Sequence, residues 1–238
     1  NTLEKVYTDF LEDEKNFKIF VGKIESEGEG YLDKHFDDFI AAYDAEYIAG
    51  AVIDGVLVYS EAFFLGMRQK YPLHEQELAT LIKPYGETFL GRYKKELLHV
   101  ATGIEGKYGE TSELLKNNAI SGELEKLQRS FHWIQNNYKN VEALPIEFFA
   151  GQLLELLRKE KDVLMGELDE LNESVEKHQK ECDEIKNRNI FSTDDLAKLL
   201  WVGKIGWWVD RRKEYNLLSN HYIGRHLRWI CQKYGMAY

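Results

Sequence analysis

With 238 residues, the chain is long enough for one large domain or two small ones, and either can bury a hydrophobic core. Hydrophobic residues make up 44% of it and charged residues 30%, which is typical of a folded soluble protein. The net charge of −10 argues against a dedicated nucleic-acid-binding protein, which needs a basic surplus. Only three prolines interrupt a sequence rich in Glu, Lys and Leu, so the composition favours an all-helical fold.

The charge is distributed unevenly along the chain. Residues 1–61 contain 15 acidic and 5 basic residues, whereas residues 186–238 contain 4 acidic and 10 basic ones. The simpler interpretation is two solvated faces that lie opposite each other across the fold. The alternative is an acidic surface that attracts a basic partner, because such electrostatic fields steer association.

Two cysteines, Cys182 and Cys231, are too few for a disulfide framework. They fit a reducing compartment, so we expect a cytoplasmic protein; the alternative is a single disulfide in an oxidising compartment. Cys182 falls on a regular apolar pattern, and we expect it to be a small core residue.

The N-terminal region predicts two helices separated by a loop. Apolar residues recur at helical spacing over residues 3–24, after a threonine that can cap the helix. Residues 25–30 read ESEGEG, with two glycines and no side chain to pack, so we expect a loop there. A second, acidic helix then begins near Tyr31 and leads into the most apolar stretch of the chain.

That stretch, Tyr47–Met67, is apolar on every side over 21 residues. A helix that is hydrophobic all round must be surrounded by other helices or by lipid. It is long enough to span a bilayer, which takes about 20 apolar residues. Two acidic residues within it, Asp54 and Glu61, would each cost roughly 2.5–3.5 kcal/mol at the centre of a membrane. We therefore expect the buried central helix of a soluble bundle, with no stable membrane insertion.

Asp54 and Glu61 also form a candidate pocket. They are seven residues apart, so they project from nearly the same side of one helix. The simpler interpretation is that each is paired with a polar group of a neighbouring helix, because buried acids are rarely left unpaired. The functional alternative is a recessed pocket lined by carboxylates and aromatic side chains.

Pro72 ends the apolar helix, because the residue before a proline avoids the helical conformation. The helical pattern resumes up to Val100 and is followed by TGIEGKYGE, whose three glycines make the clearest flexible connection in the chain. We therefore predict two helical halves, residues 1–103 and 110–238, which can also form one continuous domain.

Between residues 144 and 186 the sequence has the spacing of a coiled-coil seam. The seam positions are Leu157, Lys161, Leu164, Leu168, Leu171, Val175, His178, Cys182 and Ile185. An unbroken helix over this range would be more than about 60 Å long. We expect a long heptad-patterned helix or one arm of a helical hairpin, paired within the chain. The alternative is a homodimer through residues 157–185.

The C-terminal region predicts a helix that starts at Ser192 or Thr193, with Asp194 and Asp195 in its first turn. Its tryptophans and arginines could stack on and neutralise a nucleic acid. Because the tryptophans recur at helical spacing and the sequence pI is about 5.3, we expect them to pack in the core instead.

No known catalytic or metal-binding motif is present. Glu96 and His99 have the spacing of a di-iron helical bundle, but such a site needs this unit twice and no second one occurs. His221 and His226 are five residues apart and do not share a helix face. We therefore expect no catalytic residue, no metal and no cofactor, and a protein that is not an enzyme.

The acidic helix YLDKHFDDFIAAYDAEY, the glycine-spaced helix that follows it and the Trp-rich basic end resemble the plan of a known class of protein. This class is the all-helical bacterial immunity proteins that neutralise contact-delivered toxins. The resemblance covers most of the chain and implies an inhibitor that covers the active site of a toxin and does no chemistry. If the toxin is a nuclease with a basic cleft, an acidic surface would complement it.

The candidate partner-binding residues under this hypothesis are Asp33, Asp37, Asp38, Asp44 and Glu46. The simpler interpretation of these acids is an ordinary solvated helix face. The partner that we expect is a cognate protein, most simply a toxin. Two other classes remain open: a helical enzyme or small-ligand sensor, and a coiled-coil dimer scaffold.

Overall fold

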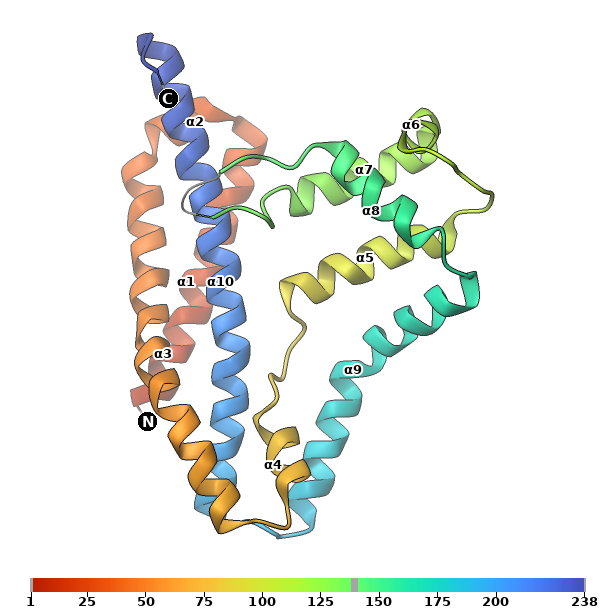
Figure 1. The fold of residues 1–238 in the computed structure, drawn as a ribbon. Coiled ribbons are helices and arrows are strands. Elements are labelled where there is room, and N and C mark those ends of the chain that lie inside the picture. Colours follow the sequence, from red (N-terminus) through yellow and green to blue (C-terminus); the bar gives the residue numbers. More distant parts are fainter. Residues whose placement is uncertain (1, 138–140, 238) are drawn as a thin grey trace.

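The computed structural model describes residues 2–137 and 141–237, without the side chains of residues 2, 3, 49, 54 and 57. Over this part of the chain it contains ten α-helices and no strand, which confirms the all-α prediction (Figure 1). The helices are α1 (Thr2–Glu27), α2 (Glu29–Lys34), α3 (Phe36–Lys70), α4 (Glu75–Ile82), α5 (Phe89–Gly103), α6 (Thr111–Lys116), α7 (Asn118–Phe131), α8 (Ile146–Leu156), α9 (Lys161–Asn187) and α10 (Thr193–Tyr234).

Three long helices form a bundle at one side of the molecule. α1 and α10 run in one direction and α3 in the other, with the short α2 at the turn between α1 and α3 (Figure 1). The core of this bundle is aromatic. Its largest fully buried side chains are Phe10, Phe17, Phe39, Trp208, Tyr215 and Tyr222. Burial of side chains of this size is the main force that holds the three helices together.

A second core lies beside the bundle, where α5, α7 and α8 pack with the first half of α9. α9 then runs towards the base of the bundle, where its last turns pack with α4 and with the start of α10. Contacts between α10 and α4 and between α5 and α9 therefore join residues from both halves of the sequence.

The loop predicted over residues 25–30 is nearly all helical. α1 continues to Glu27, α2 starts at Glu29, and only Gly28 separates them. Gly28 has a φ of 81°, which a residue without a β-carbon adopts without strain. One glycine with positive φ is therefore enough to turn the chain, and the acidic residues around it remain in helices.

The predicted heptad helix is present but shorter than an unbroken helix over residues 144–186. α8 ends at Leu156 and α9 begins at Lys161, so the first seam position, Leu157, falls in the connection. Within α9 the seam is buried inside the chain at Leu164, Leu168, His178, Cys182 and Ile185. Its first part packs against α5 and its last part against α4 and α10. The expected intramolecular pairing is confirmed for these buried side chains.

The central position predicted for Tyr47–Met67 is wrong. This stretch lies in α3, a peripheral helix, and only 13% of the most apolar 18-residue window of α3 is buried. α10 takes the central place instead, because it packs against α3, α4, α5 and α2. A helix that is apolar all round buries only the strip for which the fold supplies a neighbour, and α3 has neighbours along one side.

Candidate functional site

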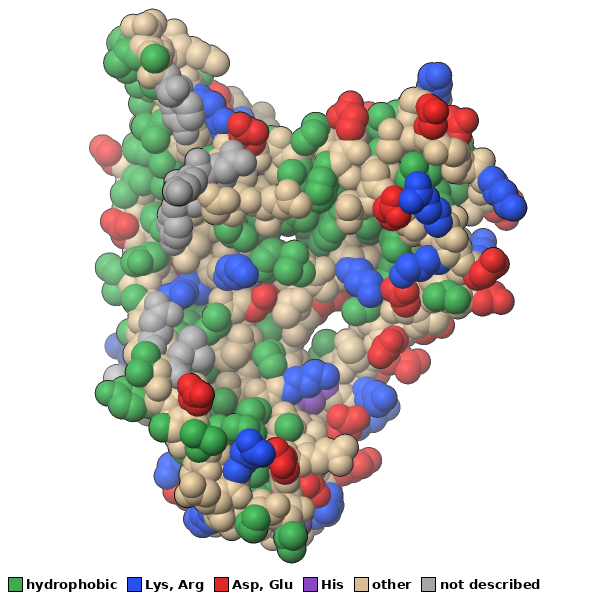
Figure 2. Space-filling model, in the orientation of Figure 1, with side chains coloured by type: hydrophobic (Ala, Val, Ile, Leu, Met, Phe, Trp, Pro, Cys, Tyr) green, Lys and Arg blue, Asp and Glu red, His purple; other side chains and the backbone are tan. Residues whose placement is uncertain are grey.

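α3 has one face in the bundle and one face in solvent. The inner face buries Phe39, Ile53 and Met67 against α1, α4 and α10. The opposite side, from here on the α3 outer face, consists of nine exposed residues that carry no charge. They are Ile48, Ala51, Val52, Gly55, Val58, Tyr59, Ala62, Leu65 and Gly66. Figure 2 shows hydrophobic side chains along the edge of the molecule that α3 forms.

The α3 outer face is long as well as apolar. From Ile48 to Gly66 a helix rises roughly 27 Å. Val58 and Tyr59, in the middle of the face, are 76% and 75% exposed. Among the described residues, α3 is the helix that is long and apolar enough to cross a membrane by length and composition. Contiguous exposed apolar surface is typical of sites that contact another protein or a membrane.

The two ends of α3 carry opposite charge. Asp37, Asp38 and Asp44 are exposed on its first turns, and Asp38 contacts the Nδ1 atom of His35 at 3.2 Å. Arg68 and Lys70 are exposed on its last turn. The acidic end also suits the positive end of the helix dipole, and the basic end suits the negative end.

The predicted partner-binding residues do not all face solvent. Asp33 lies on α2 and contacts the Nζ atom of Lys233 at 3.3 Å. Asp37, Asp38 and Asp44 are exposed, as a partner-binding surface requires. Glu46 is only 1% exposed, so its inclusion in that surface is wrong. It lies on the strip of α3 that the bundle covers.

The candidate pocket of Asp54 and Glu61 stays a prediction from the sequence. The side chain of Asp54 lies outside the described residues, and Glu61 is exposed at the edge of the α3 outer face.

Glu46 belongs to a buried polar region between α3 and α10. Neither of its carboxylate oxygens has a hydrogen-bond partner. Burial raises the pKa of Glu46 to about 8, although the nearby Arg212 guanidinium lowers it and Asp13 raises it further. Gly50, one turn along α3, leaves room for Arg212, because a β-carbon there would lie 2.5 Å from the Cδ atom of that arginine.

A set of largely buried ion pairs links three helices. Arg211 on α10 donates to Glu14 on α1, and its second guanidinium nitrogen lies 3.5 Å from Glu214. Arg92 on α5 donates to Glu214 as well. These contacts join α5 to the three-helix bundle. Sequence reasoning missed them, because Arg211 stands in a run of basic residues that is typical of a solvated surface.

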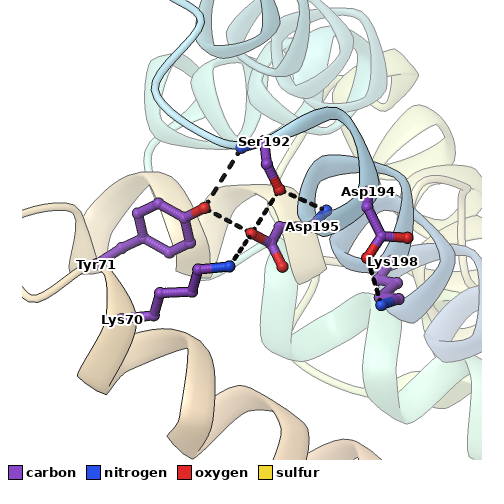
Figure 3. A network of polar contacts seen from close by, with 6 residues as sticks. All are labelled: Lys70, Tyr71, Ser192, Asp194, Asp195 and Lys198. Atoms are coloured by element: carbon purple, nitrogen blue, oxygen red, sulfur yellow. Dashed lines mark hydrogen bonds and ion pairs between the residues drawn. The ribbon is translucent and has the colours of Figure 1, made fainter.

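The end of α3 is fixed to the start of α10 by a polar network (Figure 3). Asp195 accepts hydrogen bonds from Lys70 at 2.7 Å, from Tyr71 at 2.6 Å and from the hydroxyl of Ser192 at 2.6 Å. The oxygen of Ser192 also accepts from the backbone N–H of Asp195, which confirms Ser192 as the predicted helix cap. These hydrogen bonds hold the pKa of Asp195 well below its usual range. The network is structural, since it orients α3 against α10.

A polar recess of about 600 Å³ lies at the other end of α10. His132 and His221 face each other in it, with their Nε2 atoms 3.1 Å apart. Burial lowers the pKa of His221 to about 3, and His132 and the arginines nearby lower it further. Arg225, at the rim, contacts Glu25 at 3.0 Å. Over the described residues no group of three or more metal-binding side chains occurs.

Comparison with protein families, with characterised proteins and with solved structures found no match to this chain. The resemblance to immunity proteins therefore remains a prediction from the sequence pattern.

Proposed function

We propose that this chain is a non-catalytic protein-binding module that docks its partner on the α3 outer face. The observation that carries the proposal is the exposure of large apolar side chains along this face, with Val58 and Tyr59 about three-quarters exposed. Covering apolar surface is favourable by roughly 25 cal/mol for each Å² removed from water. A helix face in a protein groove is a common recognition mode, read at this spacing of residues.

The acidic end of α3 would orient a bound partner along the helix. Asp37, Asp38 and Asp44 are exposed and adjoin the apolar face. A basic partner surface would meet these acids while apolar side chains cover the rest of the face. Together with the resemblance to immunity proteins, this arrangement supports a cognate bacterial toxin with a basic surface as the partner class.

The experiment is a pull-down: the tagged chain is used to capture bound proteins from the native host, and quantitative mass spectrometry identifies them. The face variant carries Val52→Lys and Tyr59→Lys. The control variant carries Val163→Lys and Met165→Lys, two exposed apolar residues on α9. We expect wild type and control to recover a protein that the face variant does not recover. An untagged copy of the chain itself counts as such a protein. Equal recovery by all three would contradict the proposal.

The acidic end is tested separately by reversing Asp37, Asp38 and Asp44 to lysine. If the partner is a basic toxin, this triple variant should lose it while circular dichroism shows unchanged helix content. Unchanged recovery of that partner would remove the acidic residues from the interface and leave the apolar face in place.

A further inference from the structure

We propose that the α3 outer face is occupied by a second copy of this chain, in a two-fold symmetric dimer with its α3 helices antiparallel. This inference rests on the proposed function, because it names an occupant of the same surface. It goes beyond that function because it gives the face an occupant in the purified chain and specifies the register of the contact.

The contact is formed by one seam of α3. Its members recur at intervals of three and four residues, as in a helix that packs along a second helix. They are Asp44, Ile48, Val52, Gly55, Tyr59, Ala62, Gly66 and Lys70, and all are exposed. The seam contains three large apolar side chains, at Ile48, Val52 and Tyr59, and three small residues, Gly55, Ala62 and Gly66.

One antiparallel register brings large side chains onto small ones throughout this seam. A two-fold axis midway between Gly55 and Tyr59 places each of these two residues opposite the other in the partner copy. The same axis places Val52 opposite Ala62 and Ile48 opposite Gly66 in the partner copy. Each protruding side chain thus meets a position where the opposing helix has little or no side chain, which lets the two backbones approach closely.

The charges at the ends of the seam agree with the same register. Asp44 and Lys70 lie at equal distances from the axis, so each acid would face a lysine of the other copy. Lys70 contacts Asp195, but its side chain is 56% exposed and remains within reach of a second carboxylate. A parallel arrangement would place acid beside acid and base beside base. Self-complementarity of this kind is the property of a two-fold interface.

The size of the seam predicts a dimer that dissociates on dilution. A strip roughly 39 Å long and about 10 Å wide has a footprint below the ~800 Å² per partner of a standard interface. Tyr47, Val58 and Leu65, exposed along the edges of the seam, would add to the covered area. We therefore expect dissociation constants in the micromolar range and a monomer that stays folded.

A lipid bilayer fits the same face less well. α1 and α10 pack along α3, so a membrane-spanning α3 would carry the exposed charges of α1, such as Glu12 and Lys15, into the hydrocarbon region. A helix lying in the membrane surface is normally flanked by lysine and arginine, whereas Asp37, Asp38 and Asp44 would face anionic lipid. The dimer leaves Asp37 and Asp38 beyond the seam and uncovered.

The first test is the mass of the purified chain by light scattering, from about 1 to 200 μM. We expect the average mass of wild type and of the control variant Val163→Lys, Met165→Lys to rise towards that of a dimer. The face variant Val52→Lys, Tyr59→Lys should stay monomeric, since the dimer would bury both lysines without partners. Circular dichroism establishes that all three are folded. A wild-type chain that is monomeric throughout would overturn the dimer, while recovery of a different protein on the face would still uphold the proposed function.

The second test fixes the register by disulfide cross-linking in a Cys231→Ser background. One tagged chain carries Val52→Cys and an untagged chain carries Ala62→Cys. In the proposed register the cysteine at position 52 of one chain forms a disulfide with the cysteine at position 62 of the other. Two cysteines at the same position in the two chains would be roughly 15 Å apart along the helix and could not form a disulfide. Cross-links of each cysteine to itself would overturn the antiparallel arrangement. If the chain stays monomeric and binds phosphatidylcholine–phosphatidylserine vesicles, the proposal that a second copy occupies the face is wrong.

Discussion

At the scale of single residues, buried charge is the most informative feature of this chain. Glu46 is buried without a hydrogen-bond partner, whereas Glu14 and Glu214 are both buried in contact with Arg211. A buried carboxylate without hydrogen-bond donors takes up a proton more readily, because burial makes its ionisation costly. A carboxylate with several donors does the opposite, as Asp195 illustrates. The two cases predict opposite dependences of stability on pH.

Glu46→Gln should change the dependence of stability on pH. In the folded chain the pKa of Glu46 is about 8, and in the unfolded chain it is near the ordinary value. Between these values the folded state holds the extra proton, so the free energy of unfolding falls as pH rises. The slope from this group is about 1.4 kcal/mol per pH unit. We expect the free energy of unfolding of the variant, measured in urea, to rise relative to that of wild type from pH 5 to pH 8. The same dependence on pH for both proteins would contradict this.

Asp195→Asn should weaken the attachment of α3 to α10. The carboxylate accepts from three donors, and we expect the change to lower the free energy of unfolding by about 1–3 kcal/mol at pH 7. Because the pKa of Asp195 is depressed, its contribution is present above the ordinary pKa and is lost as pH falls below about 4. The difference between wild type and variant should therefore shrink in acid.

Asp194→Asn is the matched control for this prediction. The carboxylate of Asp194 is exposed and contacts Lys198, one turn further along the same helix (Figure 3). We expect a change within about 0.5 kcal/mol, as for other exposed ion pairs. Equal losses for Asp194→Asn and Asp195→Asn would mean that the network does not hold the two helices together.

At the scale of helices, packing depends on where two elements approach most closely. α10 meets α4 at Gly203, where a β-carbon would lie 2.9 Å from the carbonyl oxygens of Leu81 and Lys83. Backbone atoms at this distance cannot turn aside as a flexible side chain can. The glycine therefore sets the distance between these helices.

Gly203→Ala should destabilise the protein by about 1–3 kcal/mol, because α10 must move away from α4. Gly151→Ala on α8 is the control, since a β-carbon there meets nothing within 4 Å. Alanine should raise the free energy of unfolding at that position by up to about 1 kcal/mol. Thermal unfolding of the two variants, compared with wild type, distinguishes a packing effect from the ordinary propensity of glycine.

At the scale of the whole molecule, α3 separates stability from binding. Its inner face holds the three-helix bundle together, while its outer face makes no contribution to the core. Val58→Lys on the outer face should change the free energy of unfolding of the monomer by no more than about 0.5 kcal/mol. Phe39→Ala on the inner face should lower it by about 3–5 kcal/mol. Urea unfolding of dilute protein measures both, and a large loss for Val58→Lys would mean that the outer face packs within the chain.

The sequence by itself determined the helices and several of their ends. Periodic apolar residues, the Ser192 cap and the glycines after α5 act through contacts within about four residues, so they can be read locally. The same local reading placed a loop at residues 25–30, where a single glycine was sufficient. It also identified the seam of α9, because a heptad pattern requires some partner.

Only the tertiary structure decided which sides of these helices are covered. The apolar stretch of α3 reads as a core helix, yet it lacks neighbours on one side, whereas Arg211 reads as a surface cation and is buried against Glu14, 197 residues away in the chain. Burial is fixed by contacts between distant segments, and no local pattern encodes them. For the same reason the sequence pointed to the acids of α3, and the fold separated Asp37, Asp38 and Asp44 in solvent from Glu46 in the core.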